Sequence, residues 1–162
     1  MKSISKHPTK SNAFEHSIFI FGPTGVGKTE LLLDLDPQRF SVINADSIQV
    51  YRYLDIGSAK ASQAARCAIE HHLIDIRDPW QQFSVGNFIE EADKACLLIH
   101  EQGKIPVISG GTAYYFKHFL YGLSEAPPSD ETIRNALAQR IEQEGRTWRS
   151  EERRVGKECR SR

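Results

Sequence analysis

The sequence has few cysteines and no long apolar run, and each absence excludes a class of protein. Its three cysteines, Cys67, Cys96 and Cys159, form no Cys-x-x-Cys pair, which argues against a disulfide framework or a zinc site and fits a reducing cytoplasm. No stretch approaches the ~18 apolar residues that span a bilayer, so we expect no membrane partner. The start of the chain also lacks the apolar segment of a secretory signal, and we expect residues 1–16 to be a disordered leader.

An excess of charge of either sign is absent as well. Twenty-one Lys and Arg residues balance twenty-one Asp and Glu residues, so the overall charge does not indicate a nucleic-acid or acidic membrane partner. Apolar residues make up 40% and charged residues 26% of the chain, as in soluble globular proteins. A length of 162 residues suits one domain of ordinary size.

The end of the chain differs in character from the rest. Residues 149–162, RSEERRVGKECRSR, carry six basic and three acidic side chains. The string resembles the translation of a common sequencing adaptor, so we interpret 149–162 as a non-native tail. The alternative is a genuine basic arm that binds nucleic acid. One domain over residues 17–148 remains.

Short apolar runs alternate with helical periodicity along that domain. Strands are predicted over 17–21, 40–43, 72–76 and 105–108, because each is an apolar run of a length typical of buried parallel strands. Helices are predicted over 28–35, between Ser84 and Gly103, from near Ala113, and over 130–144 after a Ser129 cap. The order of strand and helix predicts an α/β fold, a right-handed parallel sheet flanked by helices.

The first predicted strand leads directly into a phosphate-binding motif. The string GPTGVGKT satisfies GxxxxGK followed by Ser or Thr, and it opens a predicted helix. Its glycines let backbone N–H groups turn toward a phosphate, the helix N-terminus adds positive charge, and the lysine reaches the terminal phosphate. The threonine hydroxyl suits a phosphate-bound Mg²⁺, so we expect Mg²⁺ as cofactor with Thr29 as its ligand. The predicted phosphate-binding residues are Gly22, Pro23, Thr24, Gly25, Val26, Gly27, Lys28 and Thr29.

Two further strand ends carry polar residues. Asp46 follows the second strand at the edge where open α/β sheets bind ligands. The sequence leaves three interpretations open: Asp46 holds Mg²⁺, acts as a general base, or caps a helix that begins at Ser47. The strand that ends near Ile108 leads into Gly110, Gly111 and Thr112. The two glycines either allow close approach of the backbone to a substrate or form an ordinary strand-to-helix turn. This strand does not end in an acidic residue, which disfavours a conventional ATPase.

Several other polar and aromatic residues have less specific interpretations. Lys60 and Arg77 lie in predicted loops and either touch phosphate or, as is commoner, remain solvated charges. His71 and His72 lack a third ligand at recognisable spacing, so we interpret them as structural or surface residues. Trp80 is expected to pack against the core.

Five segments resemble the tRNA dimethylallyltransferase (tRNA isopentenyltransferase) family, and they occur in the family's order. The resemblance runs from about residue 18 to residue 148, and five ordered motifs are far more specific than a P-loop alone. It implies a P-loop NTPase-like parallel sheet flanked by helices. The matching segments are GPTGVGKT (22–29), NADSIQVYRYLDIGSAK (44–60), HHLIDIRDP (71–79), FSVGNF (83–88) and ISGGTAYYFK (108–117).

This resemblance implies an enzyme, a prenyltransferase that modifies tRNA. The family transfers a dimethylallyl group from dimethylallyl diphosphate to the exocyclic amine of the adenosine beside the anticodon, in tRNAs that read codons starting with U. The P-loop would then hold the diphosphate, with Thr24 to Thr29 in contact with it. We expect Asp46, Lys28 and Thr112 to be catalytic, with the Asp46 carboxylate accepting the proton of the amine. The residues implied to contact the tRNA anticodon stem-loop are Asp46, Ser47, Ile48, Gln49, Thr112 and Arg134.

The sequence departs from the family in three ways. Gly25 and Val26 replace a frequent Ala-Ser pair, Ala61 follows Lys60 where proline is usual, and family members are considerably longer. We therefore expect an N-terminal fragment, truncated before the C-terminal part, whose own transfer activity is weak or absent. The intact enzyme is expected to be a cytoplasmic monomer.

Other functions also explain the P-loop. One is a small P-loop kinase that acts on a nucleoside monophosphate or a metabolite, and another is a non-catalytic, ATP-binding module. The kinase leaves DSIQVY, DIGSAK and GGTAYYFK unexplained, and no arginine-rich lid is evident before residue 149. Adenylate prenyltransferases, which use a free nucleotide as acceptor, are a related alternative, but the DSIQ segment favours tRNA.

Overall fold

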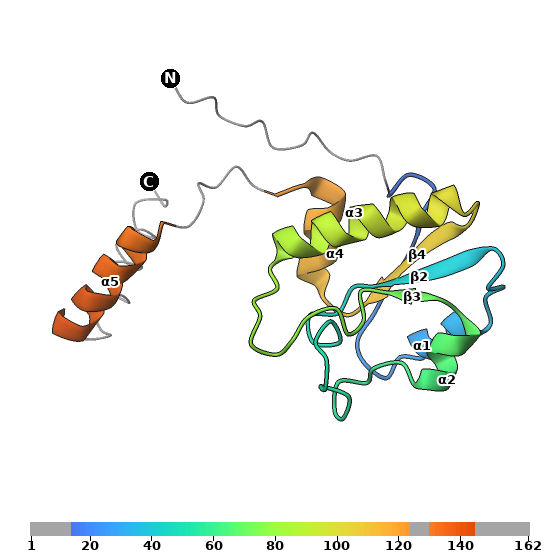
Figure 1. Cartoon of the computed structure of the whole chain (residues 1–162), viewed down its shortest axis with the longest axis horizontal. Coiled ribbons are helices and arrows are strands. Elements are labelled where there is room, and N and C mark those ends of the chain that lie inside the picture. Colours follow the sequence, from blue (N-terminus) through green and yellow to red (C-terminus); the bar gives the residue numbers. More distant parts are fainter. Residues whose placement is uncertain (1–13, 124–129, 145–162) are drawn as a thin grey trace, which may run out of the picture. The chain divides into compact units, whose positions relative to one another are not determined.

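Four parallel strands form the sheet in the order β1-β4-β2-β3 (Figure 1). The structure is a computed structural model that describes residues 14–123 and 130–144. Each neighbouring pair of strands runs parallel, which confirms the predicted sheet. The strands are β1 (Ile18–Phe21), β2 (Phe40–Asn44), β3 (His71–His72) and β4 (Ile105–Gly110).

Helices follow the strands, and four of the five helices in the described part of the chain were predicted. The unpredicted α2 begins after Ser62, whose hydroxyl accepts a hydrogen bond from the Ala65 N–H at 3.2 Å, as an N-cap does. None of the helices described over 14–123 and 130–144 is long and apolar enough to cross a membrane. The helices are α1 (Lys28–Leu33), α2 (Gln63–Ala68), α3 (Val85–Glu101), α4 (Ala113–Tyr121) and α5 (Glu131–Glu144).

Alternating residues of the central strands pack against two helical layers. Ile43 and Ile108 point toward α3 and α4, and they join a cluster with the buried residues of those helices. Their neighbours Val42 and Val107 point the other way and contact Leu32 of α1 and Ile69. Strands buried on both faces read as continuous apolar runs, which is why β2 and β4 were predictable. Figure 1 shows α3 and α4 on one face of the sheet and α1 and α2 on the other.

The third strand is much shorter than the predicted strand over 72–76. It ends at His72, because Leu73 and Asp75 adopt positive φ angles of 62° and 57°. Such left-handed backbone cannot continue a strand. The apolar run therefore belongs to a turn that leaves the sheet, and the prediction for 73–76 was wrong.

The start of the described chain is ordered, although we expected residues 1–16 to be a disordered leader. Phe14 was placed in the leader, but its ring packs 5.6 Å from that of Phe119. The described part divides into two compact units after Leu123, inside the predicted domain. Residues 1–13, the Ser129 cap and the tail at 149–162 lie outside the described residues.

The second unit contains α5, which confirms the helix predicted over 130–144. Its first turn is capped by Asp130, whose Oδ1 accepts hydrogen bonds from the N–H groups of Thr132 at 2.8 Å and Ile133 at 3.3 Å. Ile133 is 60% exposed, and no described residue of the helix is buried. The apolar stripe of α5 is therefore open within its own unit.

The backbone that follows β2 lies so close to Gly110 of β4 that no side chain fits there. A Cβ atom at Gly110 would lie 2.2 Å from the carbonyl oxygen of Ala45, so we expect Gly110→Ala to lower the free energy of unfolding by about 3 kcal/mol through overpacking. Gly111→Ala is the matched control, because its Cβ would lie 3.4 Å from the Gly22 oxygen. Thermal unfolding of both variants tests this, and equal melting temperatures would contradict it.

Candidate functional site

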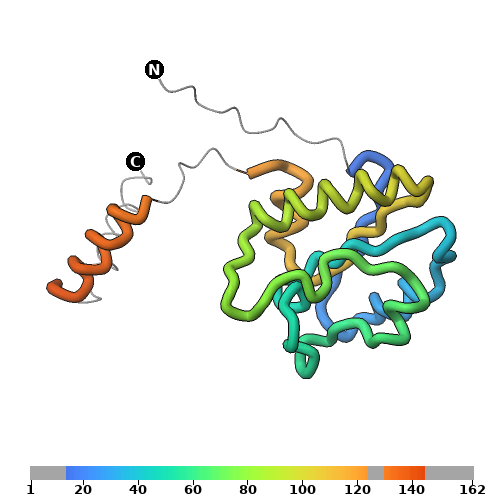
Figure 2. Tube along the Cα trace, in the orientation of Figure 1, coloured from blue at the N-terminus to red at the C-terminus, as the bar shows by residue number. Residues whose placement is uncertain are grey.

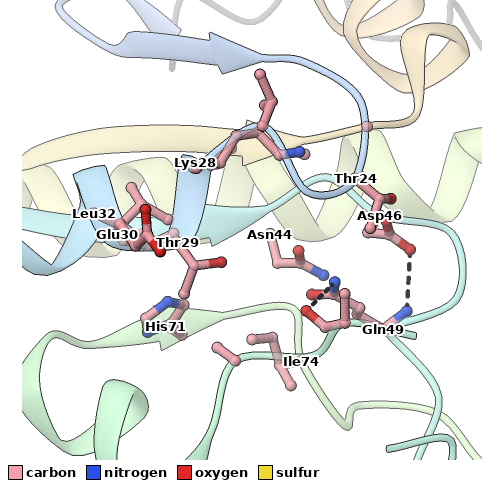
Figure 3. Close-up of a pocket in the computed structure, with 18 of the residues that line it drawn as sticks. Thr24, Lys28, Thr29, Glu30, Leu32, Asn44, Asp46, Gln49, His71 and Ile74 are labelled. Carbon is pink, nitrogen blue, oxygen red and sulfur yellow. Dashed lines mark hydrogen bonds between the residues drawn. The ribbon is translucent and has the colours of Figure 1, made fainter. Parts of the chain in front are cut away.

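A cavity of about 440 Å³ opens at the carboxyl ends of β1, β2 and β4. In Figure 3, Lys28 lies on one side of it and Ile74 on the opposite side, with Asn44 between them. The sheet order explains this placement, because it brings the segments that follow β1, β2 and β4 to one edge. Eight of the predicted site residues line the cavity: Thr24, Gly25, Val26, Gly27, Lys28, Thr29, Asp46 and Gln49.

The P-loop has the backbone conformation that its glycines allow. Gly25 and Gly27 have φ angles of 82° and 91°, a region that residues with a side chain rarely adopt. The Lys28 ammonium folds back over the loop and donates hydrogen bonds to the carbonyl oxygens of Gly22 and Pro23, both at 2.8 Å. These contacts hold the cation at the mouth of the loop, where an anionic ligand would meet it.

Asp46 stabilises a tight turn and also faces the cavity. Its Oδ1 accepts hydrogen bonds from the N–H groups of Ile48 at 2.8 Å and Gln49 at 3.3 Å, and Figure 3 shows the second of these. The segment that begins at Ser47 is a turn and not a helix, so the N-cap interpretation holds only as a turn cap. A carboxylate fixed in this way presents a set orientation to a ligand.

Thr112 lies beside the Asp46 segment but is not among the described residues that line the cavity. Its hydroxyl oxygen accepts a hydrogen bond from the Ser47 N–H at 3.1 Å, and its own N–H donates to the Ala45 oxygen at 3.3 Å. The structure therefore brings Thr112 and the Asp46–Gln49 segment together. The observed contacts give the threonine a structural role in holding that segment.

The cavity wall opposite the P-loop includes residues that the motifs did not reveal. Gln49 donates from Nε2 to the carbonyl oxygens of Ser58 at 3.0 Å and Ala59 at 3.1 Å. This holds the loop before α2 against the cavity. Gly110 and Gly111, which were predicted either to allow close approach to a substrate or to form an ordinary turn, also line the cavity. The cavity-lining residues that we did not predict are Glu30, Leu32, Val42, Asn44, Ala59, Ala61, His71, Ile74 and Ser109.

Asn44 was recognisable in principle, because it is the last residue of β2, at the edge where open α/β sheets bind ligands. It stands two positions before Asp46 and is buried. Its Nδ2 donates to the Leu73 oxygen at 3.3 Å, which supports the turn after β3. Asn44 thus connects β2 with the opposite cavity wall.

His71 lines the cavity and has a defined tautomer. Its Nδ1 lies 2.8 Å from the Ile69 oxygen, and a carbonyl only accepts, so Nδ1 carries the hydrogen. Burial lowers the pKa of the imidazole below 6.5, with a further lowering from Arg66 and His72 against the opposing effect of the Ile69 oxygen. The side chain is therefore neutral at pH 7.

This histidine makes stability dependent on pH. The unfolded chain takes up the proton first, because the folded pKa lies below the unfolded value of 6.5. We expect full stability above about pH 6.5 and a falling melting temperature as the pH drops below it. His71→Asn, with His100→Asn on α3 as control, should reduce this slope in a melting-temperature series. His72, whose pKa burial also lowers, would account for the remaining slope. An unchanged slope in His71→Asn would contradict the assignment.

The donors in the cavity fit a cation held mainly by a ligand's phosphates. Among the described residues, no group of three or more His, Cys, Asp or Glu side chains forms a metal site. The Thr29 hydroxyl and the Asp46 carboxylate, however, both line the cavity. Magnesium commonly uses one or two protein oxygens and takes the rest from phosphate and water, and this donor set suits it.

Lys60 and Trp80 differ from the predictions. The side chain of Lys60 is 3% exposed and forms ion pairs with Asp55 and Asp75, so it is not a solvated loop charge. Trp80 is 78% exposed and does not pack in the core. Arg77 pairs with Glu91 at 3.3 Å. These three outcomes depend on how distant loops meet, which local sequence does not show.

Arg134 belongs to the second unit, in α5. Its backbone N–H donates a hydrogen bond to the backbone carbonyl oxygen of Asp130 at 3.0 Å. Its assignment to the site therefore rests on the sequence resemblance alone.

Comparison with known proteins gives a consistent match. The sequence model of a protein family described as IPP transferase matches residues 49–157. The tRNA dimethylallyltransferase of Borrelia turicatae (strain 91E135) is 46% identical over 117 residues, which is 72% of this chain and 39% of that protein. The protein of the same name from Sulfurihydrogenibium sp. (strain YO3AOP1) is 50% identical over 121 residues, 74% of this chain and 39% of that one. The chain thus spans about two fifths of the length of these curated relatives.

Solved structures agree with the sequence matches. The full-length tRNA isopentenylpyrophosphate transferase from Bacillus halodurans is 37% identical, with a TM-score of 0.63 over 81% of this chain and 44% of that chain. A eukaryotic dimethylallyltransferase, described as acting on tRNA, is 34% identical, with a TM-score of 0.60 over 72% of this chain and 28% of that chain. Both support the P-loop-like α/β fold.

Proposed function

The chain belongs to the IPP transferase family, and from this membership we propose that its cavity is the donor and acceptor site of a tRNA prenyltransferase. The proposed reaction moves a dimethylallyl group from dimethylallyl diphosphate to the exocyclic amine of the adenosine beside the anticodon. The observation that carries the proposal is that Lys28 and Asp46 line the same cavity. A cation for the leaving diphosphate and a base for the amine are thereby brought together.

The P-loop would bind the diphosphate of the donor. Its backbone N–H groups, between Thr24 and Thr29, and the Lys28 ammonium offer hydrogen bonds to the phosphate oxygens. Negative charge grows on the diphosphate as the carbon–oxygen bond breaks, so these groups would stabilise the transition state more than the ground state. Mg²⁺, when bound with Thr29 as ligand, supplies further neutralisation of that charge.

Asp46 would accept the proton of the attacking amine. The amine of adenine is a poor nucleophile, since its lone pair is delocalised into the ring, and a carboxylate that removes its proton promotes attack on the allylic carbon. The new carbon–nitrogen bond forms as the carbon–oxygen bond to diphosphate breaks. Gln49, beside Asp46, faces the cavity and is a proposed contact of the acceptor.

The acceptor is proposed to be a tRNA anticodon stem-loop. Its adenosine must leave the stack to reach the cavity, which costs less in a loop than in a duplex. The relatives' names and the eukaryotic enzyme described as acting on tRNA support this acceptor.

Calorimetric titration with dimethylallyl diphosphate and, separately, with ATP tests the donor, each with and without Mg²⁺. We expect tighter binding of the prenyl diphosphate, in a Mg²⁺-dependent manner. A preference for ATP would instead favour a kinase or a nucleotide-binding module. Mass spectrometry of an anticodon stem-loop incubated with donor and chain, beside a loop whose target adenosine is replaced, then tests the transfer.

A further inference from the structure

A lysine whose side chain is 3% exposed joins the two segments that form the cavity wall opposite the P-loop. The first segment covers residues 49–61 and the second residues 73–77. The Lys60 ammonium donates to Asp55 Oδ1 and Asp75 Oδ1, each at 2.7 Å, and to the Tyr51 oxygen at 2.9 Å. Three acceptors thus satisfy the three N–H donors of the ammonium, as a buried charge requires.

Asp75 extends this network to α2. Its Oδ2 accepts a hydrogen bond from Arg66 Nη1 at 2.6 Å, while its Oδ1 is bound to Lys60. Burial alone would raise the pKa of the Asp75 carboxyl, but the hydrogen bonds from Lys60 and Arg66 outweigh it and lower the pKa. Burial would likewise lower the pKa of Lys60, and its bonds to Asp55 and Asp75 raise it instead. Both partners therefore stay charged at neutral pH.

The backbone of both segments is held in unfavourable conformations. Tyr53, Ala59, Leu73 and Asp75 have φ angles of 65°, 51°, 62° and 57°. These are four of the five non-glycine residues with positive φ in the described part of the chain. Such conformations persist only where the surroundings fix them, and they gather at functional sites.

The network is directly connected to the cavity. Ala59 and Ala61, on either side of Lys60, line the cavity, as does Ile74 beside Asp75. The two segments also pair through their backbones, since the Arg52 N–H donates to the Arg77 oxygen at 2.8 Å. Figure 2 shows them, in teal and green, running beside each other.

We propose that Lys60, acting with Asp75, is a positioning residue that fixes the cavity wall on the acceptor side. The proposal rests on the proposed function only in assigning that wall to the acceptor. The P-loop follows β1 and leads into α1, outside both segments. Loss of the lysine should therefore disturb acceptor binding and leave diphosphate binding intact.

The test compares Lys60→Met with Lys60→Arg, which keeps the charge, and with Lys104→Met as control. Lys104 is a matched residue because it is also partly buried and paired with a carboxylate, Glu70, at 3.6 Å. Hydrogen exchange of the full chain is measured over residues 49–61 and 73–77. Affinities for dimethylallyl diphosphate with Mg²⁺ and for an anticodon stem-loop are measured in parallel.

In Lys60→Met we expect about tenfold faster exchange in the two segments, with α3 and β4 unchanged. Stem-loop affinity should fall about tenfold while diphosphate affinity stays within about twofold, and Lys60→Arg should restore much of both losses. Unchanged exchange in Lys60→Met, or an equal loss of both affinities, would overturn the proposal.

The experiment distinguishes a failure of the proposed function from a failure of the role proposed for Lys60. A wild-type chain that binds no prenyl diphosphate or no stem-loop contradicts the proposed function, and the exchange comparison alone then decides the role of Lys60. If Lys60→Met does not fold, Asp75→Asn, which keeps the shape of the side chain, is measured in the same way. Global loss of protection in Asp75→Asn as well would show a purely structural role and overturn the proposal.

Discussion

Lys28→Met is expected to weaken binding of dimethylallyl diphosphate by roughly 10–100-fold, the effect of losing a charge-assisted hydrogen bond of about 1.5–3 kcal/mol. The Lys28 ammonium lies at the mouth of the P-loop, 2.8 Å from the Gly22 and Pro23 oxygens. A diphosphate in the cavity would compete with these neutral oxygens for the Lys28 ammonium, and its negative charge would favour it. Methionine keeps the length of the side chain and removes the cation, and calorimetric titration measures the loss.

The control for this variant is Lys94→Met. Lys94 lies on α3, is 68% exposed, and pairs with Glu91 at 3.5 Å, so its loss removes one positive charge without touching the cavity. Because the Lys28 ammonium also binds two loop oxygens, thermal melts must show that the Lys28→Met chain is folded. A folded Lys28→Met chain with wild-type affinity would show that the Lys28 ammonium does not bind the diphosphate.

The sheet and the P-loop were predictable because each depends on local sequence. Strands β2 and β4 are buried on both faces, so their apolar runs are continuous and short. The P-loop motif specifies its own conformation, since Gly25 and Gly27 supply the positive φ angles that the loop requires. A reader of the sequence needs no distant contact to recognise either feature.

The errors, and the cavity residues that were not predicted, concern segments whose structure is set by distant contacts. The apolar run after His72 looked like a strand, but the Asn44 side chain binds the Leu73 oxygen and supports a turn there. Lys60 lies in a loop sequence, and only the fold brings Asp75 to within 2.7 Å of its ammonium. His71 is a cavity residue because β3 joins the sheet beside β2. Contacts between residues so far apart in the sequence leave little trace in the local sequence pattern.

Asp46 has one observed role, in the turn, and one proposed role, as the base, and a pair of substitutions can distinguish them. Its Oδ1 accepts the Ile48 and Gln49 N–H groups, a role that an asparagine oxygen can also fill. Its basicity, in contrast, is lost in Asn and Ala alike. Asp46→Asn therefore keeps the turn and removes the base, whereas Asp46→Ala removes both.

Asp46→Asn is expected to slow prenyl transfer by about 10²–10⁴-fold, the range for loss of a general base, with diphosphate affinity close to that of the wild type. Because we expect transfer by the chain itself to be weak, single-turnover conditions with the chain in excess and mass detection of the product measure the rate relative to the unsubstituted chain, and calorimetry measures donor affinity. Asp34→Asn, on the exposed C-terminal end of α1, is the control. If Asp46→Asn lost rate and Mg²⁺-dependent donor affinity to the same extent, Asp46 would act as a metal ligand and the base would have to be another group in the cavity.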